Sequence, residues 1–243
     1  MLRPDLLAYL LAGFLALWGV STSRFDRWAF SAGGGTSRKF AAYGVLLFSS
    51  WLLTAIAVWI YGWERLLVVP GSPASPIFAV IFFPLLAAFS VLALMPFIQS
   101  VRGPRWREAY ATAIRREYAE IPGFLPNNAT ERAVWIVISL TAGICEELLF
   151  RGFLIRFLHE SSLALPIAGA LAVSSVLFGL GHVYQGRKSV ITTTVGGLCF
   201  GLLFLLSGSL LPAIVLHALI DLQAAYVMRP VREAAAMASA EMA

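Results

Sequence analysis

The sequence has few charged residues, and this shortage excludes an ordinary water-soluble protein. Only 13% of its 243 residues are Asp, Glu, Lys or Arg, whereas 59% are hydrophobic. A soluble domain carries about 25% charged residues. The apolar runs continue from end to end without a large polar block. The sequence therefore predicts one integral membrane domain over residues 1–243, with the lipid bilayer as its surroundings.

Cysteine and lysine are also scarce. Cys145 and Cys199 lie in apolar segments and lack metal-ligand spacing, so neither a disulfide nor a cysteine metal site is predicted. Sixteen of the eighteen basic residues are Arg, and the net charge is +5. Fourteen of them cluster between apolar runs, where basic residues set membrane topology. We therefore predict no nucleic-acid partner.

Apolar segments of spanning length occur seven times along the chain. A transmembrane helix needs about 20 apolar residues. The segments cover residues 5–20, 40–61, 77–99, 133–157, 163–181, 189–207 and 210–228. The sequence thus predicts an all-α polytopic bundle of about seven transmembrane helices. The first segment has some character of a signal peptide, but Asp5 and the absence of a clear cleavage site favour an uncleaved span.

The basic clusters predict the orientation of the bundle. They fall in the 21–39 and 100–132 loops and after the fifth and seventh segments, whereas the alternate side has only Arg3, Arg65 and Arg156. This bias places the N-terminus outside and the C-terminus in the cytoplasm. The polar stretch 107–128 predicts an amphipathic helix on the cytoplasmic face, ended by Pro122-Gly123. Trp135 is expected at a membrane interface.

The stretch GICEELLFRGF, residues 143–153, places three charges inside a predicted span. Each ionisable group there costs about 2.5–3.5 kcal/mol on insertion scales, which makes it a candidate functional residue. Glu147 and Arg151 are one helical turn apart and can form an ion pair. Glu146 lies about 100° around the helix and has no local partner. Glu146 is therefore a candidate general base, whereas the pair is compatible with a packing role alone.

Two later segments carry further polar groups at one-turn spacing. Phe178 precedes His182 by four residues at the end of the fifth span, and His217 precedes Asp221 by four residues in the seventh. Taken singly, a histidine at a span end is usually not catalytic, and a buried His–Asp pair is compatible with packing. Three helices with such groups predict a shared polar site in the core of the bundle.

The helix between them has a close-packing face at Gly196-Gly197-x-x-x-Gly201. One glutamate and two histidines are also compatible with a metal such as zinc. The metal-binding motif HExxH is absent, and the groups come from three helices. We therefore predict no cofactor, while the spacing leaves a divalent metal open.

The order Glu-Glu-x-x-x-Arg, Phe-x-x-x-His and His-x-x-x-Asp resembles the CAAX protease and bacteriocin-processing (CPBP, or Abi) family. Its members include the type II CAAX prenyl endopeptidases. The resemblance covers a catalytic core at residues 130–228, and the first three spans carry no signature. It implies a glutamate-type intramembrane endopeptidase, a hydrolase that cleaves a membrane-associated protein or peptide.

The resemblance also implies roles for the motif residues. Glu146 would activate a water with help from His182, and His217 and Asp221 would stabilise the oxyanion. Asp221 stands where the prenyl endopeptidases have Asn, and an ionised carboxylate cannot donate a hydrogen bond. Asp221 would then orient His217, be protonated, or help to bind a metal. Three further residues would support the site: Glu147, Arg151 and Phe178.

Two other functions fit the same composition. A non-catalytic immunity or scaffold protein would keep the polar pairs for packing, and a small-solute transporter would use them to line a pathway. No inverted repeat of the kind found in transporters is present in the sequence. The short chain and plain N-terminus favour a bacterial inner membrane over a eukaryotic one.

Overall fold

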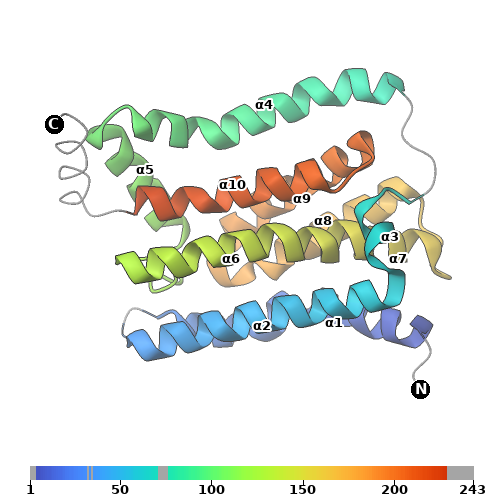
Figure 1. Cartoon of the computed structure of the whole chain (residues 1–243), viewed down its shortest axis with the longest axis horizontal. Helices are drawn as coiled ribbons and strands as arrows, with labels where there is room; N and C mark the ends of the chain where they lie inside the picture. Colours follow the sequence, from blue (N-terminus) through green and yellow to red (C-terminus); the bar gives the residue numbers. More distant parts are fainter. Residues whose placement is uncertain (1–3, 32, 34, 71–75, 229–243) are drawn as a thin grey trace.

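The computed structural model describes residues 4–31, 33, 35–70 and 76–228 (Figure 1). Within these residues the regular elements are helices, and the one strand-like pairing is an isolated bridge between Val68 and Ser209. The elements are α1 (Pro4–Ala29), α2 (Thr36–Tyr61), α3 (Trp63–Leu67), α4 (Pro76–Val101), α5 (Pro104–Glu117), α6 (Ala129–Glu147), the π-helix η1 (Leu148–Ile155), α7 (Arg156–Glu160), α8 (Ile167–Gly181), the 3₁₀ turn η2 (Val183–Gln185), α9 (Arg187–Ser207) and α10 (Leu211–Val227). The predicted all-α class is confirmed.

Each of the seven predicted apolar segments contains a helix, but the helices differ in length. Four stretches are long and apolar enough to cross a membrane: Thr36–Tyr61, Phe82–Val101, Ala129–Glu160 and Arg187–Ser207. Helix α1 makes a fifth if its two parts, which are bent by 48°, count as one span. Helices α8 and α10 are shorter, with 15 and 17 residues. The protein is therefore an integral membrane helix bundle, and its described residues contain four or five full-length spans.

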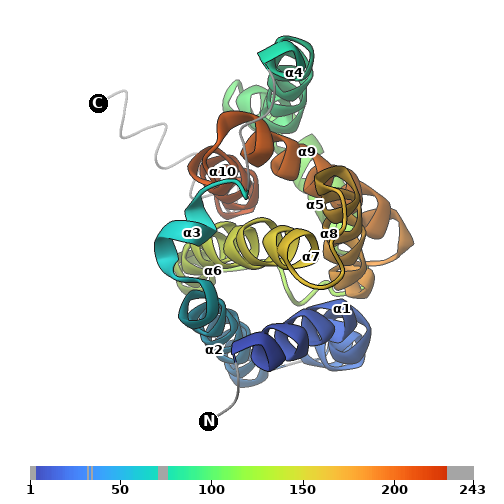
Figure 2. The ribbon, with the colours of Figure 1, turned by 90° about the vertical axis from the view of Figure 1, so that its right-hand side faces the viewer.

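Helix α6 occupies the centre of the bundle (Figure 2). It packs against α10 on one side and α2 on the other, while α8 packs against α9 and α1. Helix α4 lies at the edge next to α9 and α10. The helices that carry the three motifs thus surround one another, and α1 and α2 close the remaining side.

Helix α1 continues nine residues beyond the predicted end of the first span. Arg24 and Arg27, which were expected in a loop, therefore lie on the helix. No Pro or Gly interrupts residues 20–31, so nothing in that stretch stops the helix. Gly19 packs α1 tightly onto α8, because a Cβ at this position would lie 2.1 Å from the Leu180 carbonyl oxygen.

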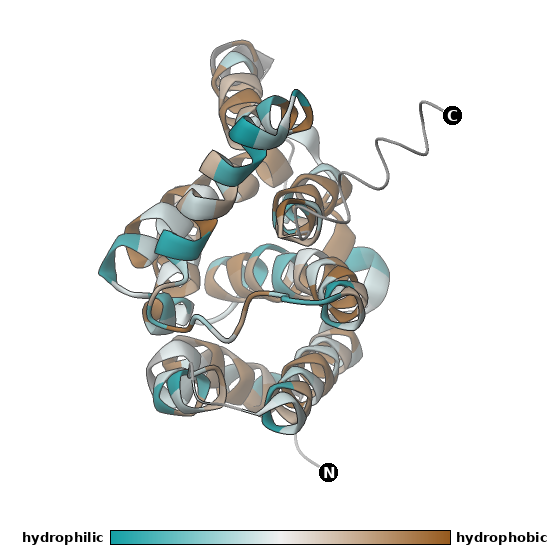
Figure 3. Ribbon diagram, turned by 90° about the vertical axis from the view of Figure 1, so that its left-hand side faces the viewer, coloured by the Kyte–Doolittle hydropathy of each residue, from teal (hydrophilic) through white to brown (hydrophobic). Residues whose placement is uncertain are grey.

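The predicted surface helix is present as α5, which is polar along much of its length (Figure 3). Its buried residues Arg107, Ala111 and Ile114 share one face at spacings of four and three. The helix ends at Glu117, ahead of Pro122-Gly123. After it the chain turns back to α1, where the Gly123 N–H donates to the Phe30 carbonyl at 2.8 Å. The predicted end of the helix was therefore too late.

Helix α6 begins with a reciprocal cap. The Asn128 side chain accepts from the Glu131 N–H at 2.9 Å and donates to the Glu131 carboxylate at 2.9 Å. Glu131 also forms a buried ion pair with Lys39 of α2, at 2.6 Å. This cluster ties the start of α6 to α2 and fixes the central helix at one end.

The predicted basic clusters gather at one end of the bundle. The end of α1, the starts of α2 and α6, and α5 lie together on the left of Figure 1, whereas α3 and α7 lie at the other end. Arg3, Arg229 and Arg232 fall outside the described residues. The predicted basic loops and the predicted loops with few basic residues thus lie at opposite ends of the bundle. The side of the membrane that each end faces stays a prediction.

Candidate active site

The buried charges at the end of α6 form the ion pair that their spacing predicts. The Arg151 Nη1 donates to Glu147 Oε1 at 2.8 Å, and the two side chains are 1% and 0% exposed. Glu146 and Glu147 are the last residues of α6, and η1 begins directly after them. Such π-helical stretches are frequent at functional sites. The pair crosses this junction and holds the two segments together.

Aromatic rings cover the Arg151 guanidinium. Its Cζ lies 4.2 Å from the centre of the Phe178 ring and 5.5 Å from that of Phe200. These cation–π contacts partly offset the removal of the charge from water. Gly197 makes room for them, because a Cβ there would lie 3.1 Å from Arg151 Nη2 and 3.1 Å from the Phe178 ring. The predicted glycine face of α9 thus packs against the site.

The neighbouring glycines on α9 differ in their packing. A Cβ at Gly201 would lie 2.2 Å from a methyl carbon of Leu171, which places Gly201 in close contact with α8. A Cβ at Gly196 would meet no atom within 4 Å. Gly197 and Gly201 therefore form the close-packing face that the motif predicts, and Gly196 does not belong to it.

His217 approaches α6 from α10 and completes a buried network. Its Nδ1 lies 2.8 Å from Glu147 Oε1. A carboxylate at this distance accepts, so Nδ1 carries the hydrogen and donates. The Phe200 ring stacks on the imidazole with a centroid distance of 5.0 Å and an interplanar angle of 12°. The orientation of His217 is thus set by Glu147 and Phe200.

The other ring nitrogen of His217 faces the two remaining carboxylates. Its Nε2 lies 3.6 Å from Asp221 Oδ2 and 3.9 Å from Glu146 Oε2. Both distances exceed those of a hydrogen bond. The predicted His217–Asp221 pair is present only as this longer contact, since the close partner of His217 is Glu147 on another helix. Sequence spacing gave no indication of that long-range contact.

Asp221 is held through its backbone as well as by its helix. The Trp135 Nε1–H donates to the Asp221 carbonyl at 3.0 Å. Trp135 is only 3% exposed, so the expectation that it lies at a membrane interface was wrong. Helix α6 begins six residues before it, and the ring packs instead against Phe124, with centroids 4.9 Å apart.

His182 caps the C-terminal end of α8. Its Nδ1 lies 2.8 Å from the Phe178 carbonyl oxygen, which can only accept, so this nitrogen carries the hydrogen. In the neutral ring the Nε2 is then left as an acceptor. The imidazole lies edge-on to the Phe178 ring, with the ring centroids 4.8 Å apart, and stacks against the Tyr184 ring, with the centroids 6.0 Å apart. Tyr184 and Phe200 are site residues that the sequence reasoning missed. Tyr184 follows His182 by two residues, and Phe200 follows Gly197 by three. This closeness in the sequence was the available signal.

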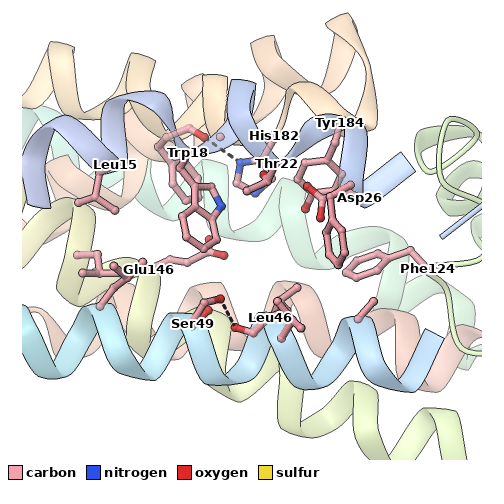
Figure 4. A pocket seen from close by; sticks show the side chains of 18 of the residues that line it. Leu15, Trp18, Thr22, Asp26, Leu46, Ser49, Phe124, Glu146, His182 and Tyr184 are labelled. Atoms are coloured by element: carbon pink, nitrogen blue, oxygen red, sulfur yellow. Dashed lines mark hydrogen bonds between the residues drawn. The ribbon is translucent and has the colours of Figure 1, made fainter. Parts of the chain in front are cut away.

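Two cavities meet at Glu146 and His182, which line both of them. The first, about 170 Å³, lies between α1 and α2, and Figure 4 shows Glu146 and His182 on its wall. The second, about 430 Å³, is also lined by His217 and Asp221. The Glu146 Oε2 has no hydrogen-bond partner within the described part of the chain. The four predicted catalytic side chains therefore share one cavity, which Phe178 also lines, and Glu147 and Arg151 pack behind it.

Within the described ranges, no group of three or more His, Cys, Asp and Glu side chains is arranged to hold a metal ion. His159, the third histidine of the chain, lies apart from the site, and its Nδ1 contacts the Leu165 carbonyl at 2.9 Å.

Residues 128–223 match the model of a family described as type II CAAX prenyl endopeptidase Rce1-like. Over this segment the chain is similar to the Rce1-like family. The segment contains all seven predicted site residues and runs from the cap of α6 to the middle of α10. This is a family of proteases, which agrees with a membrane-embedded hydrolase acting on peptide substrates. The comparisons with curated proteins and with solved structures each found no match.

Proposed function

We propose that the protein is an intramembrane endopeptidase that hydrolyses a peptide bond with a water activated by Glu146. The observation that carries this proposal is the contrast between the two adjacent glutamates. Glu147 is 0% exposed and its Oε1 is bound by Arg151 and His217, whereas the Glu146 side chain is 30% exposed and borders both cavities. A carboxylate that borders a cavity is suited to accept a proton from a water held there.

In the proposed reaction, Glu146 takes a proton from water as the water oxygen attacks the carbonyl carbon of the peptide. The carbonyl π electrons move to its oxygen and give a tetrahedral oxyanion. When the carbon–nitrogen bond breaks, the proton on Glu146 passes to the leaving amine. His182 lines the same two cavities, and its Nε2 acceptor is suited to orient the attacking water through a hydrogen bond.

His217 is the proposed oxyanion donor. Glu147 accepts from its Nδ1, so in the protonated ring the Nε2–H points to the cavity side, where Glu146 and Asp221 lie. Preorganised donors of this kind contribute about 2.7–4 kcal/mol to transition-state stabilisation. Arg151 and Phe178 act indirectly, because they hold Glu147 and Phe200 in place around the imidazole.

Asp221 is proposed to assist Glu147 and Phe200 in orienting His217. Its Oδ2 lies 3.6 Å from the Nε2, one helical turn away, and Trp135 fixes its backbone. An ionised carboxylate cannot itself donate to an oxyanion. Because Asp221 stands where the prenyl endopeptidases have Asn, His217 is left as the donor to the oxyanion. For the same reason, the proposal does not require the substrate to be a prenylated CAAX protein.

A non-catalytic scaffold or immunity protein is the second candidate. The buried Glu147–Arg151–His217 network favours it, since its ion pair and hydrogen bond join three segments of the bundle without any substrate. A scaffold role does not account for Glu146.

We further propose that the protein resides in a bacterial inner membrane with the N-terminus outside and the C-terminus in the cytoplasm.

The test uses the full-length protein in liposomes with internally quenched peptides that contain an apolar anchoring segment. In water enriched in ¹⁸O, mass spectrometry should find a single internal cut and one ¹⁸O atom in the new carboxyl group. The Glu146→Gln protein, prepared in the same way, is the control and should produce no cut. Cleavage that persists in this variant would show that Glu146 is not the base. No cleavage by the wild-type protein, with normal folding, would favour the scaffold.

A further inference from the structure

Three aromatic side chains besides His182 line both cavities: Phe178, Tyr184 and Phe124. Of these, Phe124 is the one whose ring contacts lie outside the proposed site residues. It is itself only 6% exposed (Figure 4). The Phe124 ring packs between Phe30 and Trp135, with distances between ring centroids of 4.8 and 4.9 Å. It also stacks on Tyr118, with the centroids 5.7 Å apart. The ring therefore forms one tightly packed part of the partition between the cavities.

Contacts from α2 fix the backbone of this partition. The Tyr43 hydroxyl donates to the Phe124 carbonyl, and the Lys39 Nζ donates to the Leu125 carbonyl at 2.7 Å. Lys39 is 6% exposed and is also paired with Glu131. A buried charge that satisfies both a carboxylate and a carbonyl is costly to displace. The backbone of Phe124 is thus held in place by α2.

The two cavities differ in chemistry. The first is bordered mainly by apolar side chains of α1 and α2, among them Leu15, Trp18 and Leu46, and its carboxylates are those of Asp26 and Glu146 (Figure 4). The second is larger and has three carboxylates on its wall, from Glu117, Glu146 and Asp221. Among the described residues that line this second cavity there is no Lys or Arg. A negative group placed there would meet three carboxylates, which outnumber the two imidazoles on this wall that can carry a positive charge, those of His182 and His217.

We infer that Phe124 is a specificity-determining residue that makes the site read the two sides of the scissile bond differently. A peptide lying across Glu146 places an apolar residue in the first cavity and an uncharged or basic polar residue in the second. An acidic residue is rejected from the second cavity. This inference rests on the proposed function, and it specifies the substrate as a peptide that changes from apolar to polar at the cut.

The test measures binding as well as cleavage, so that the two proposals can fail separately. Fluorescent peptides of equal length carry an apolar block joined to a Gln, Lys or Glu block, in both chain directions. Their affinities are measured by anisotropy in detergent for the Glu146→Gln protein, which binds without cutting. In the preferred direction, Gln and Lys peptides should bind at least tenfold more tightly than the Glu peptide. Equal affinities, or no binding, would overturn the inference.

Variants of the partition give the second readout. With Phe124→Ala in the same Glu146→Gln protein, the affinity ratio between the two chain directions should fall toward one, and Phe124→Leu provides a milder variant if the alanine protein does not fold. Phe89→Ala is the matched control, because Phe89 lines only the second cavity. An unchanged ratio in both Phe124 variants would contradict the inference. Cleavage by wild-type protein with no directional preference would reject it while leaving the peptidase intact.

Discussion

Replacing Arg151 with Met should strongly destabilise the protein. The change removes the cation that neutralises Glu147, whose side chain is 0% exposed, and leaves that carboxylate buried. Breaking a buried pair in this way costs about 3–5 kcal/mol. Loss of the cation–π contacts with Phe178 and Phe200 adds to this cost, while the Met side chain keeps part of the packing. Unfolding is measured by titration with a denaturing detergent in mixed micelles.

The double variant Glu147→Gln/Arg151→Met tests the physical cause. It removes both charges, and the Gln carbonyl oxygen can still accept from His217 Nδ1. We therefore expect it to be more stable than either single variant, with a coupling of about 0.5–3 kcal/mol. Arg65→Met is the control, because its pair with Glu160 is exposed and worth about 0–1 kcal/mol. A loss below about 1 kcal/mol for Arg151→Met, with additive effects in the double variant, would refute the reasoning.

Two further predictions concern packing and pH. Gly197→Ala should lower the free energy of unfolding by about 1–3 kcal/mol through its contacts with Arg151 and Phe178, whereas Gly196→Ala, with open space around it, should be neutral in the same titration. Burial raises the pKa of Tyr110 to about 12, so its contribution to stability is complete below about pH 10 and is lost as the pH rises toward 12. Tyr110→Phe should remove this dependence, and equal pH profiles would contradict it.

The parts of the site that sequence could predict are those set by local geometry. The four-residue spacing of Glu147 and Arg151 gave their ion pair, because residues one turn apart share a helix face. The same rule left Glu146 without a partner on its own helix, and it identified Gly197 and Gly201 as a close-packing face. Apolar runs likewise located the helices, since hydrophobic length is a local property.

The contacts that sequence could not predict join distant segments. His217 was assigned to Asp221 on its own helix, yet its hydrogen bond goes to Glu147, 70 residues away. Burial of Trp135 and the place of Phe124 between the cavities depend on how the 118–128 segment folds back onto α1 and α2. Helix periodicity contains no information on such pairings. The extension of α1 was missed because Arg24 and Arg27 were interpreted as loop residues.

The most direct test of the central claim compares Glu146→Gln with Glu147→Gln in one assay of peptide cleavage and unfolding. Glu146→Gln should reduce kcat/KM by at least about 10²-fold and leave the free energy of unfolding nearly unchanged, since its Oε2 makes no hydrogen bond. Glu147→Gln should lower both activity and stability, because it leaves Arg151 without its charge partner. Full activity in Glu146→Gln, measured on equal amounts of folded protein, would contradict the account.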